Sequence, residues 1–364
     1  MEAGDRGALT LRVLVVAEQL RRPVPGGIGT YVRGLLDGLS SLDPEVTLWA
    51  SRPPREDGDP LRALGRLVTS PLPAPLLVRA WDRGLGRPPG RPDVLHATSF
   101  AVPPPGNVPL SVMVHDLGWR HFPDAYPARG RRWHEAALGR ALARARLLVV
   151  PSAAVADDLL AVGAPPARVE VVEEGCDHLA PPDDDAADAL LRRVGVEGEF
   201  LLTVSTLEPR KNLPRLLAAY GAVRHRLPEP WPLVVAGSTG WGPAVQPGSG
   251  VVLAGHAGGG ALTALYRRAR LLAYVPLREG FGLPVVEAMS CGTPVVASAV
   301  PSAGGAALRV DAFDTDAIGA ALVRAATDDA LRAELIDAGR ARTAGLTWKR
   351  AARRHVELWE TMRR

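Results

Sequence analysis

Short runs of apolar, β-branched residues alternate with longer segments of helical periodicity through most of this chain. Such alternation is typical of βαβ units, in which parallel strands form a sheet and helices cover its faces. In the first half we expect strands at residues 12–17, 46–50, 93–96, 110–114, 147–150 and 169–172, and helices at 29–41, 130–145 and 153–162. The pattern therefore indicates an α/β fold built on a parallel sheet.

A polar, proline-rich stretch at residues 180–185 interrupts this pattern and is the expected linker. A second series of strands follows, expected at residues 200–205, 233–236, 251–254, 271–275 and 294–298. A length of 364 residues suits two domains. We therefore expect one α/β domain over residues 1–180, a second over 181–345 and a final helix over 346–364, for which Thr347 is the N-cap candidate.

One interval does not fit this plan. About seven residues separate the strand that ends at Ser298 from a strand-like segment at residues 306–310, whereas a crossover between parallel neighbours takes a dozen or more. Either these two strands are not parallel neighbours, or the sequence lacks residues near Ser302–Gly304.

Composition excludes several classes of protein. The two cysteines, Cys176 and Cys291, lie in distant segments without the spacing of a zinc site or a disulfide framework, so we expect a cytoplasmic protein. No apolar stretch of membrane-spanning length and no export signal is recognised. The net charge is only +4, and just two of the 43 basic residues are lysine, so we expect no nucleic-acid partner.

The strongest functional signal is the segment Glu279-Gly-Phe-Gly-Leu-Pro-Val-Val-Glu287, two carboxylates around a glycine-rich turn. It follows the expected strand at residues 271–275, and Pro284 suits the first turn of a helix, where its missing N–H would be unpaired anyway. The backbone N–H groups of residues 281–283 would then point outward and attract phosphate or polar oxygens. The alternative is a capping acid followed by a solvent-facing glutamate.

A second glycine-rich segment, Gly26-Gly-Ile-Gly29, is expected as a loop between the first strand and the first helix. Glycines there would let the backbone approach a phosphate closely. A dinucleotide-binding fingerprint is disfavoured, because a third glycine is missing and Ser51-Arg52 stands where an acid for the ribose would be expected. An ordinary turn is the remaining alternative.

Two further clusters follow expected strands. Glu208-Pro-Arg210-Lys211-Asn212 comes after the first strand of the second domain, where two cations could neutralise a diphosphate. His115-Asp116 follows the strand at residues 110–114 and could reach a sugar hydroxyl. The alternatives are a solvated charge pair and a histidine satisfied locally. Acidic pairs elsewhere lie in loops and the linker, so no metal site is expected.

Together these segments resemble the GT-B glycosyltransferases of family 4, which are retaining, nucleotide-sugar-dependent enzymes. The residues that carry the resemblance are Glu279-Gly-Phe-Gly-Leu-Pro-Val-Val-Glu287-Ala-Met, Gly292-Thr-Pro-Val-Val-Ala-Ser298, Gly26-Gly-Ile-Gly29, His115-Asp116 and Glu208-Pro-Arg-Lys-Asn212. It implies two Rossmann-like domains facing across a cleft, with the C-terminal helix crossing back to the first domain.

The resemblance also implies a role for each site residue. Glu279 would contact the transferred sugar and Glu287 the nucleotide ribose. Arg210 and Lys211 would hold the diphosphate, and His115 would lie beside the reacting sugar carbon. The residues expected to bind the donor through the backbone are Phe281, Gly282 and Leu283 from one domain and Gly27 and Gly29 from the other.

In two places the chain departs from the family. Thr206 stands where many members have arginine, so we expect Arg210 and Lys211 to supply the positive charge for the diphosphate. The family usually has a longer loop with an acidic residue after Ser298, which again indicates missing residues there.

By the same resemblance, the function is transfer of a hexose from a nucleotide diphosphate sugar to a saccharide or lipid-linked acceptor in cell-surface glycan assembly, without a further cofactor. The subgroup with Glu208-Pro-Arg-Lys-Asn212 looks like mannosyltransferases, which makes GDP-mannose the leading donor. A nucleotide-sugar epimerase and a non-catalytic nucleotide-sugar-binding protein are the alternatives. A lipid carrier would bring the enzyme to the inner face of an anionic membrane, where basic residues of the first domain could bind. These residues are Arg129, Arg131, Arg132, Arg140, Arg144 and Arg146.

Overall fold

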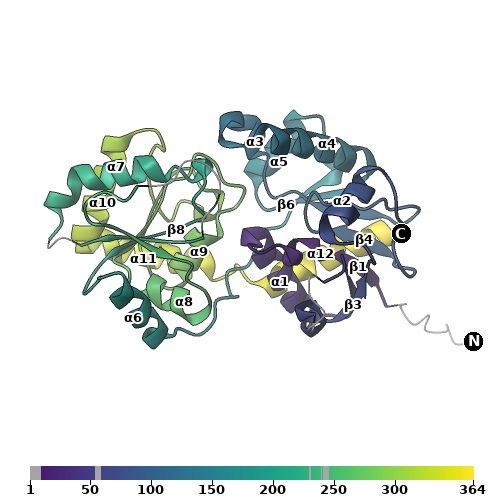
Figure 1. Cartoon of the computed structure of the whole chain (residues 1–364), viewed down its shortest axis with the longest axis horizontal. Coiled ribbons are helices and arrows are strands. Elements are labelled where there is room, and N and C mark those ends of the chain that lie inside the picture. Colours follow the sequence, from purple (N-terminus) through teal and green to yellow (C-terminus); the bar gives the residue numbers. More distant parts are fainter. Residues whose placement is uncertain (1–9, 54–58, 229–230, 239, 241–245) are drawn as a thin grey trace, which may run out of the picture.

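The computed structural model describes residues 10–53, 59–228, 231–238, 240 and 246–364, which form two lobes, each built around one parallel sheet (Figure 1). The first sheet has the strand order β3-β2-β1-β4-β5-β6-β7. Its strands are β1 (Arg12–Val16), β2 (Glu45–Ala50), β3 (Arg66–Thr69), β4 (Val94–Ala97), β5 (Leu110–Met113), β6 (Leu147–Val150) and β7 (Val169–Val171). The sequence predicted all of these except β3, an edge strand with two exposed and two half-buried residues.

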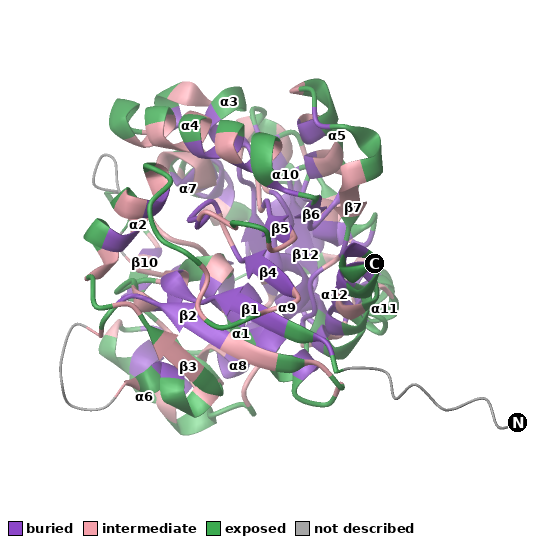
Figure 2. Ribbon diagram, turned by 90° about the vertical axis from the view of Figure 1, so that its right-hand side faces the viewer, coloured by how far each residue is buried: buried purple, intermediate pink, exposed green. Residues whose placement is uncertain are grey.

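The second sheet has the order β10-β9-β8-β11-β12-β13. Its strands are β8 (Leu201–Val204), β9 (Leu233–Ala236), β10 (Val251–Gly255), β11 (Leu271–Tyr274), β12 (Val295–Ala297) and β13 (Leu308–Arg309). The strands of both sheets are largely buried, whereas the helices over them expose their outer faces (Figure 2). The α/β class with two Rossmann-like domains is thereby confirmed.

Helices of the first domain follow its strands as βαβ units require. They are α1 (Gly26–Leu39), α2 (Ala74–Asp82), α3 (Gly118–His121), α4 (Ala128–Arg144) and α5 (Ala153–Ala161). The expectation of a glycine-rich loop at residues 26–29 is wrong, because these residues form the first turn of α1. The backbone N–H of Gly29 donates to the carbonyl of Pro25 at 3.2 Å, and the preset φ of Pro25 suits a helix start.

Helices of the second domain begin inside the expected linker. They are α6 (Asp184–Arg193), α7 (Leu213–Val223), α8 (Gly259–Arg268), α9 (Leu283–Ser290), α10 (Thr315–Thr327) and α11 (Asp329–Thr343). Asp183 caps α6 by accepting a hydrogen bond from the N–H of Ala186, and Asp184 and Asp185 lie in the first turn. The acidic run therefore stabilises a helix N-terminus rather than extending the linker.

The short interval after β12 also differs from expectation. β12 and β13 are parallel neighbours, with Val296 paired to Leu308 and Ala297 to Arg309. A single 3-10 turn at Pro301–Ala303 replaces the usual crossover helix. Because β13 has only two residues at the edge of the sheet, this short connection suffices and no additional residues are needed to join the strands.

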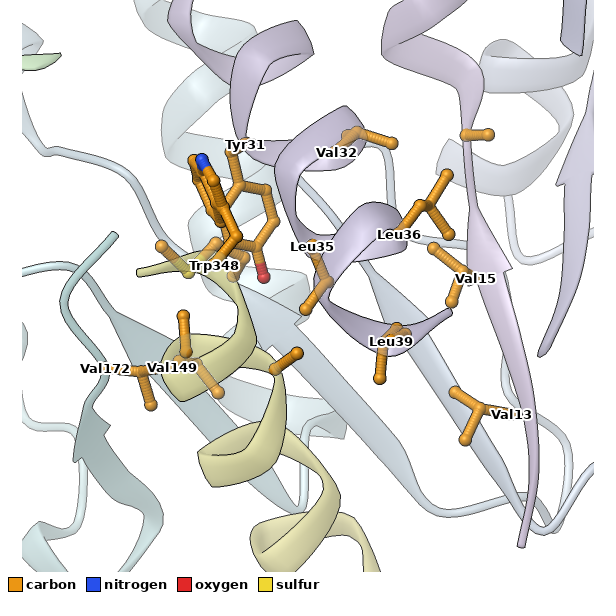
Figure 3. Close-up of a cluster of buried hydrophobic side chains, with 14 of the residues drawn as sticks. Val13, Val15, Tyr31, Val32, Leu35, Leu36, Leu39, Val149, Val172 and Trp348 are labelled. Atoms are coloured by element: carbon orange, nitrogen blue, oxygen red, sulfur yellow. The ribbon is translucent and has the colours of Figure 1, made fainter. Parts of the chain in front are cut away.

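The last helix, α12 (Trp348–Arg363), returns to the first domain and packs along α1. Thr347 is its N-cap, as predicted, and accepts a hydrogen bond from the N–H of Arg350. Trp348 fits against Gly34, where a Cβ would lie 2.1 Å from the indole ring, so only glycine allows this approach. Figure 3 shows Trp348 beside Tyr31 of α1 within the same hydrophobic cluster. None of the described helices is long and apolar enough to cross a membrane.

Candidate active site

The candidate site lies where the loops that follow β8 and β11 meet. These two strands are parallel neighbours in the second sheet, so the segments after their carboxyl ends emerge side by side. Arg210 and Lys211 follow β8 in one 3-10 turn, and Glu279 lies between β11 and α9. The fold thereby brings together three residues that the sequence placed at the site.

The carboxylate of Glu279 is held by two cations and a phenol. Its Oε1 accepts hydrogen bonds from Nζ of Lys211 at 2.6 Å, from Nη1 of Arg210 at 2.9 Å and from the hydroxyl of Tyr274 at 3.0 Å. Only about a tenth of each charged side chain is exposed. Burial alone would raise the pKa of Glu279, but the charges of Arg210 and Lys211 outweigh it and lower the pKa to about 2. The carboxylate is therefore ionised throughout the physiological range.

Tyr274 belongs to this cluster, although the sequence did not single it out. Its hydroxyl accepts a hydrogen bond from Nζ of Lys211 at 2.9 Å while donating to Glu279. Burial, together with the Glu279 charge, raises the pKa of Tyr274 well above its ordinary value, so the hydroxyl keeps its proton. The available signal was its position as the last residue of β11, beside the edge of the sheet where ligands bind.

The turn before α9 has the predicted form. Gly282 caps the helix with φ = 100°, and Pro284 lies in the first turn. Among the described residues, the structure gives the backbone N–H groups of Phe281, Gly282 and Leu283 no acceptor. The Phe281 and Leu283 side chains are buried in the hydrophobic cluster of the first domain that contains Tyr31. A free helix N-terminus of this kind suits the oxygens of a polar ligand.

His115 is brought to the same loop from the first domain. Its carbonyl oxygen lies so close to Gly280 that a Cβ there would come within 1.7 Å of it. On the ring, Nε2 is 2.9 Å from the carbonyl of Thr98 and must carry the proton, because a carbonyl only accepts. Nδ1 lies 3.4 Å from Oε1 of the buried Glu174, a second residue that the sequence did not single out.

A buried hydrogen-bond chain ties the C-terminal helix to this region. The hydroxyl of Tyr31 lies 2.9 Å from Nε2 of His355 and 3.0 Å from Nε2 of His96. Since Nδ1 of His355 donates to the carbonyl of Ala351, and burial lowers the pKa of His355 to about 4, its Nε2 accepts the Tyr31 proton. The rings of Tyr31 and His115 lie in a T-shaped arrangement with their centroids 5.0 Å apart. Helix α12 therefore helps to fix the position of His115.

Gly27 and Gly29, the two residues of the first domain that were expected to bind the donor, have different surroundings. A Cβ at Gly27 would lie 3.8 Å from Cδ1 of Leu283, which places the first turn of α1 beside the start of α9. A Cβ at Gly29 would clash with Pro25 at 2.3 Å, so Gly29 faces its own domain. Gly27 is therefore at the domain interface, and Gly29 serves the packing of the helix start.

Glu287 lies inside α9 with both carboxylate oxygens engaged. Oε1 accepts from Nε2 of His178 at 2.9 Å, and Oε2 accepts from the hydroxyl of Tyr266 at 2.7 Å. Nδ1 of His178 accepts from the indole N–H of Trp348, so the ring proton is on Nε2. Neither partner was predicted, since both come from segments distant in sequence. Each oxygen keeps a lone pair for a further donor such as a ribose hydroxyl.

Comparisons with known proteins define the class. Residues 25–178 match the family model described as Glycosyltransferase Family 4, and residues 193–342 match that of Glycosyl transferases group 1. With two Rossmann-like domains and this site between them, the chain belongs to the GT-B glycosyltransferases of family 4.

Individual relatives agree with this assignment. The chain is 31% identical over 328 residues to D-inositol 3-phosphate glycosyltransferase 1 from Catenulispora acidiphila, covering 79% of this chain and 76% of that protein. It is 28% identical over 263 residues to O-antigen chain mannosyltransferase B from Escherichia coli, covering 68% of this chain and 69% of that protein. The crystal structure of Anabaena HepE in complex with UDP and glucose superposes with a TM-score of 0.72 at 16% identity, over 96% of this chain and all of that one, and supports the fold alone.

Proposed function

We propose that this glycosyltransferase moves a hexose from a nucleotide diphosphate sugar to an acceptor hydroxyl and retains the anomeric configuration. The observation that carries the proposal is the contact of Glu279 with Arg210 and Lys211 just before the N-terminus of α9. An ionised carboxylate that can orient sugar hydroxyls thus lies beside two cations that can hold a diphosphate.

In this proposal the residues act by orientation and charge. Glu279 and the backbone N–H groups of residues 281–283 bind the sugar, Arg210 and Lys211 bind the diphosphate, and Glu287 binds the ribose. The bond between the anomeric carbon and the phosphate oxygen breaks, and the acceptor oxygen bonds to that carbon from the same face. The acceptor proton passes to the leaving phosphate. Lys211 and Arg210 stabilise the negative charge that develops there.

Mannose is the proposed sugar and GDP-mannose the proposed donor. The support is the similarity to O-antigen chain mannosyltransferase B, together with the Glu208-Pro-Arg-Lys-Asn212 segment. A thermal-shift screen of GDP, UDP, ADP and their sugars tests the donor, since a bound ligand raises the melting temperature by mass action. We expect selective stabilisation by GDP and GDP-mannose. Selective stabilisation by UDP and UDP-sugars would instead show that the nucleotide of the donor carries uracil.

Turnover then tests the reaction itself. Incubation with the selected donor and a panel of saccharide and polyprenyl-linked saccharide acceptors should give a glycoside whose anomeric configuration, read by NMR, equals that of the donor. An inverted product would refute retention. Conversion of the donor to an isomerised nucleotide sugar in the absence of acceptor would favour an epimerase. Donor binding without any turnover would favour a regulatory protein. Neither alternative has a specific observation in its favour.

Peripheral contact with an anionic membrane at the cytoplasmic face is part of the proposal. Of the six arginines in and beside α4, four are exposed and Arg140 is paired with Asp82. The exposed ones are Arg129, Arg132, Arg144 and Arg146. Vesicle co-sedimentation should increase with anionic lipid and fall in R129E/R132E, but not in the control Arg192→Glu on the second domain. Vesicle binding that does not depend on the anionic lipid content would contradict membrane contact through these arginines.

A further inference from the structure

We propose that Arg278 is a positioning residue, whose ion pair with Asp158 across the domain interface holds Glu279 and Arg210 in their bonded arrangement. Arg278 directly precedes Glu279 in the loop between β11 and α9. Its Nη2 lies 2.5 Å from Oδ2 of Asp158 in α5, and 3.4 Å from the carbonyl of Ala154. The side chain thus crosses from the second domain to the first. This inference rests on the proposed function, because it takes Glu279 as the sugar-binding carboxylate.

The backbone of Arg278 connects this ion pair to Arg210 and Glu279. Its carbonyl accepts a hydrogen bond at 2.9 Å from Nη1 of Arg210, the same nitrogen that donates to Glu279 at 2.9 Å. Arg210 is largely buried, so a displaced carbonyl would leave its guanidinium without one of its few acceptors. Movement of residue 278 therefore disturbs the pair that orients Glu279.

The residue on the other side of Glu279 is also anchored to the first domain. The hydroxyl of Ser152 donates to the carbonyl of Gly280 at 2.6 Å, and Gly280 lies against the carbonyl of His115. Glu279 is therefore bracketed by two contacts with the first domain, one through a side chain and one through the backbone. Because the Ser152 hydroxyl also caps α5, the ion pair is the contact that a substitution can remove without disturbing a helix N-terminus.

Asp158 is itself held in place. Its Oδ1 lies 2.9 Å from Nε2 of His121, while Oδ2 faces Arg278, and only 11% of the side chain is exposed. An orientation fixed in this way, in a mostly desolvated setting, distinguishes the pair from exposed ion pairs of small effect. Arg268 and Asp188 form such an exposed pair within the second domain, at 2.6 Å, and provide the matched control.

The test compares Arg278→Ala, Arg278→Lys, Asp158→Asn and the double variant R278A/D158N with the control Arg268→Ala. Misplacement of a reacting group by about 1 Å costs up to roughly 100-fold in rate. We expect Arg278→Ala to lower kcat by about 10- to 100-fold with KM within a few fold, and Arg278→Lys to recover part of that loss. The double variant should lose no more than the worse single one, because both changes remove one interaction.

Hydrogen exchange of residues 275–283 supplies a readout that needs no turnover. Exchange there should be faster in Arg278→Ala and in the isosteric Asp158→Asn, and unchanged in Arg268→Ala. Unchanged exchange together with parental kcat, or losses that add in the double variant, would overturn the inference. Should the parent protein transfer no sugar at all, the proposed function fails while the exchange data still decide whether the ion pair positions this loop.

Discussion

Lys211 and Arg210 contact the same oxygen of Glu279, at 2.6 and 2.9 Å respectively. Two cations therefore share one oxygen of Glu279, and a second carboxylate, that of Glu208, lies 3.9 Å from Arg210. A diphosphate that approaches this edge of the sheet meets Lys211 and Arg210 in a mostly buried setting, where Coulomb attraction is stronger than in water. The carboxylate of Glu279 in turn limits how far either cation can move.

The low pKa of Glu279 predicts how stability depends on pH. Its pKa of about 2 lies below the ordinary value of 4.5, so the charge stabilises the folded state above pH 4.5 and this contribution is lost as pH falls toward 2. The shift corresponds to about 3 kcal/mol, of which roughly 1 kcal/mol should be gone at pH 3.5. Urea unfolding of the parent and Glu279→Gln should show a difference that shrinks between pH 7 and 3.5. A constant difference would contradict the assigned shift.

Gly280→Ala should abolish most activity through the domain interface. A Cβ at residue 280 would come within 1.7 Å of the carbonyl oxygen of His115, so the loop or the first domain must move. Because Glu279 is adjacent, we expect kcat to fall by about 100-fold or more, as for a misplaced reacting group. Gly139→Ala is the control: this position in α4 has no neighbour within 4 Å, and the change should stabilise the helix by roughly 0.5–1 kcal/mol. Parental activity in Gly280→Ala would show that the two domains need not meet here.

The sequence predicted the sheets and part of the site for physical reasons. Buried parallel strands appear as short β-branched runs, whereas β3 was missed because half of its residues face solvent. Arg210, Lys211 and Glu279 lie together in the structure because they follow β8 and β11, two parallel neighbours, and the sequence singled them out because ligands of parallel sheets bind beyond the strand ends. Tyr274, Glu174 and His178 were missed. Tyr274 contacts Glu279 only five residues away, and its position as the last residue of β11 was the available signal. Glu174 and His178 contact residues distant in sequence, and no local pattern indicates such contacts.

Activity should survive chelation, because Arg210, Lys211 and the N-terminus of α9 supply the positive charge for the diphosphate. Among the described residues, no three potential ligands converge as a metal site would require. The measurement is initial rate after dialysis against EDTA. Loss of activity that Mg²⁺ or Mn²⁺ restores would show that a metal ion shares the phosphate charge.

Glu287→Gln should chiefly weaken donor binding. The amide introduced by this substitution can keep both contacts, with its oxygen accepting from the N–H of His178 and its NH₂ group donating to the hydroxyl of Tyr266, which can accept as well as donate. The fold should therefore persist, while the carboxylate charge proposed to bind the ribose is lost. We expect KM for the donor to rise about tenfold with kcat nearly unchanged, because the ribose contact is the same in ground and transition states. A fall in kcat alone would instead assign Glu287 to the reacting sugar.

Lys211→Ala tests the charge that the proposed reaction uses most. Nζ of Lys211 lies at the carboxyl edge of the sheet between Glu279 and Tyr274, where a leaving diphosphate would gain negative charge. An interaction that strengthens as the sugar–phosphate bond breaks lowers the barrier more than it tightens donor binding. By analogy with loss of one preorganised donor, kcat should fall by about 10²- to 10³-fold, or about 3 to 4 kcal/mol. Arg210 still pairs with Glu279, so the fold should persist, and a melting curve checks this. A folded variant with kcat within a few fold of the parent would mean that Lys211 only balances Glu279, and Arg210 would become the residue that holds the diphosphate.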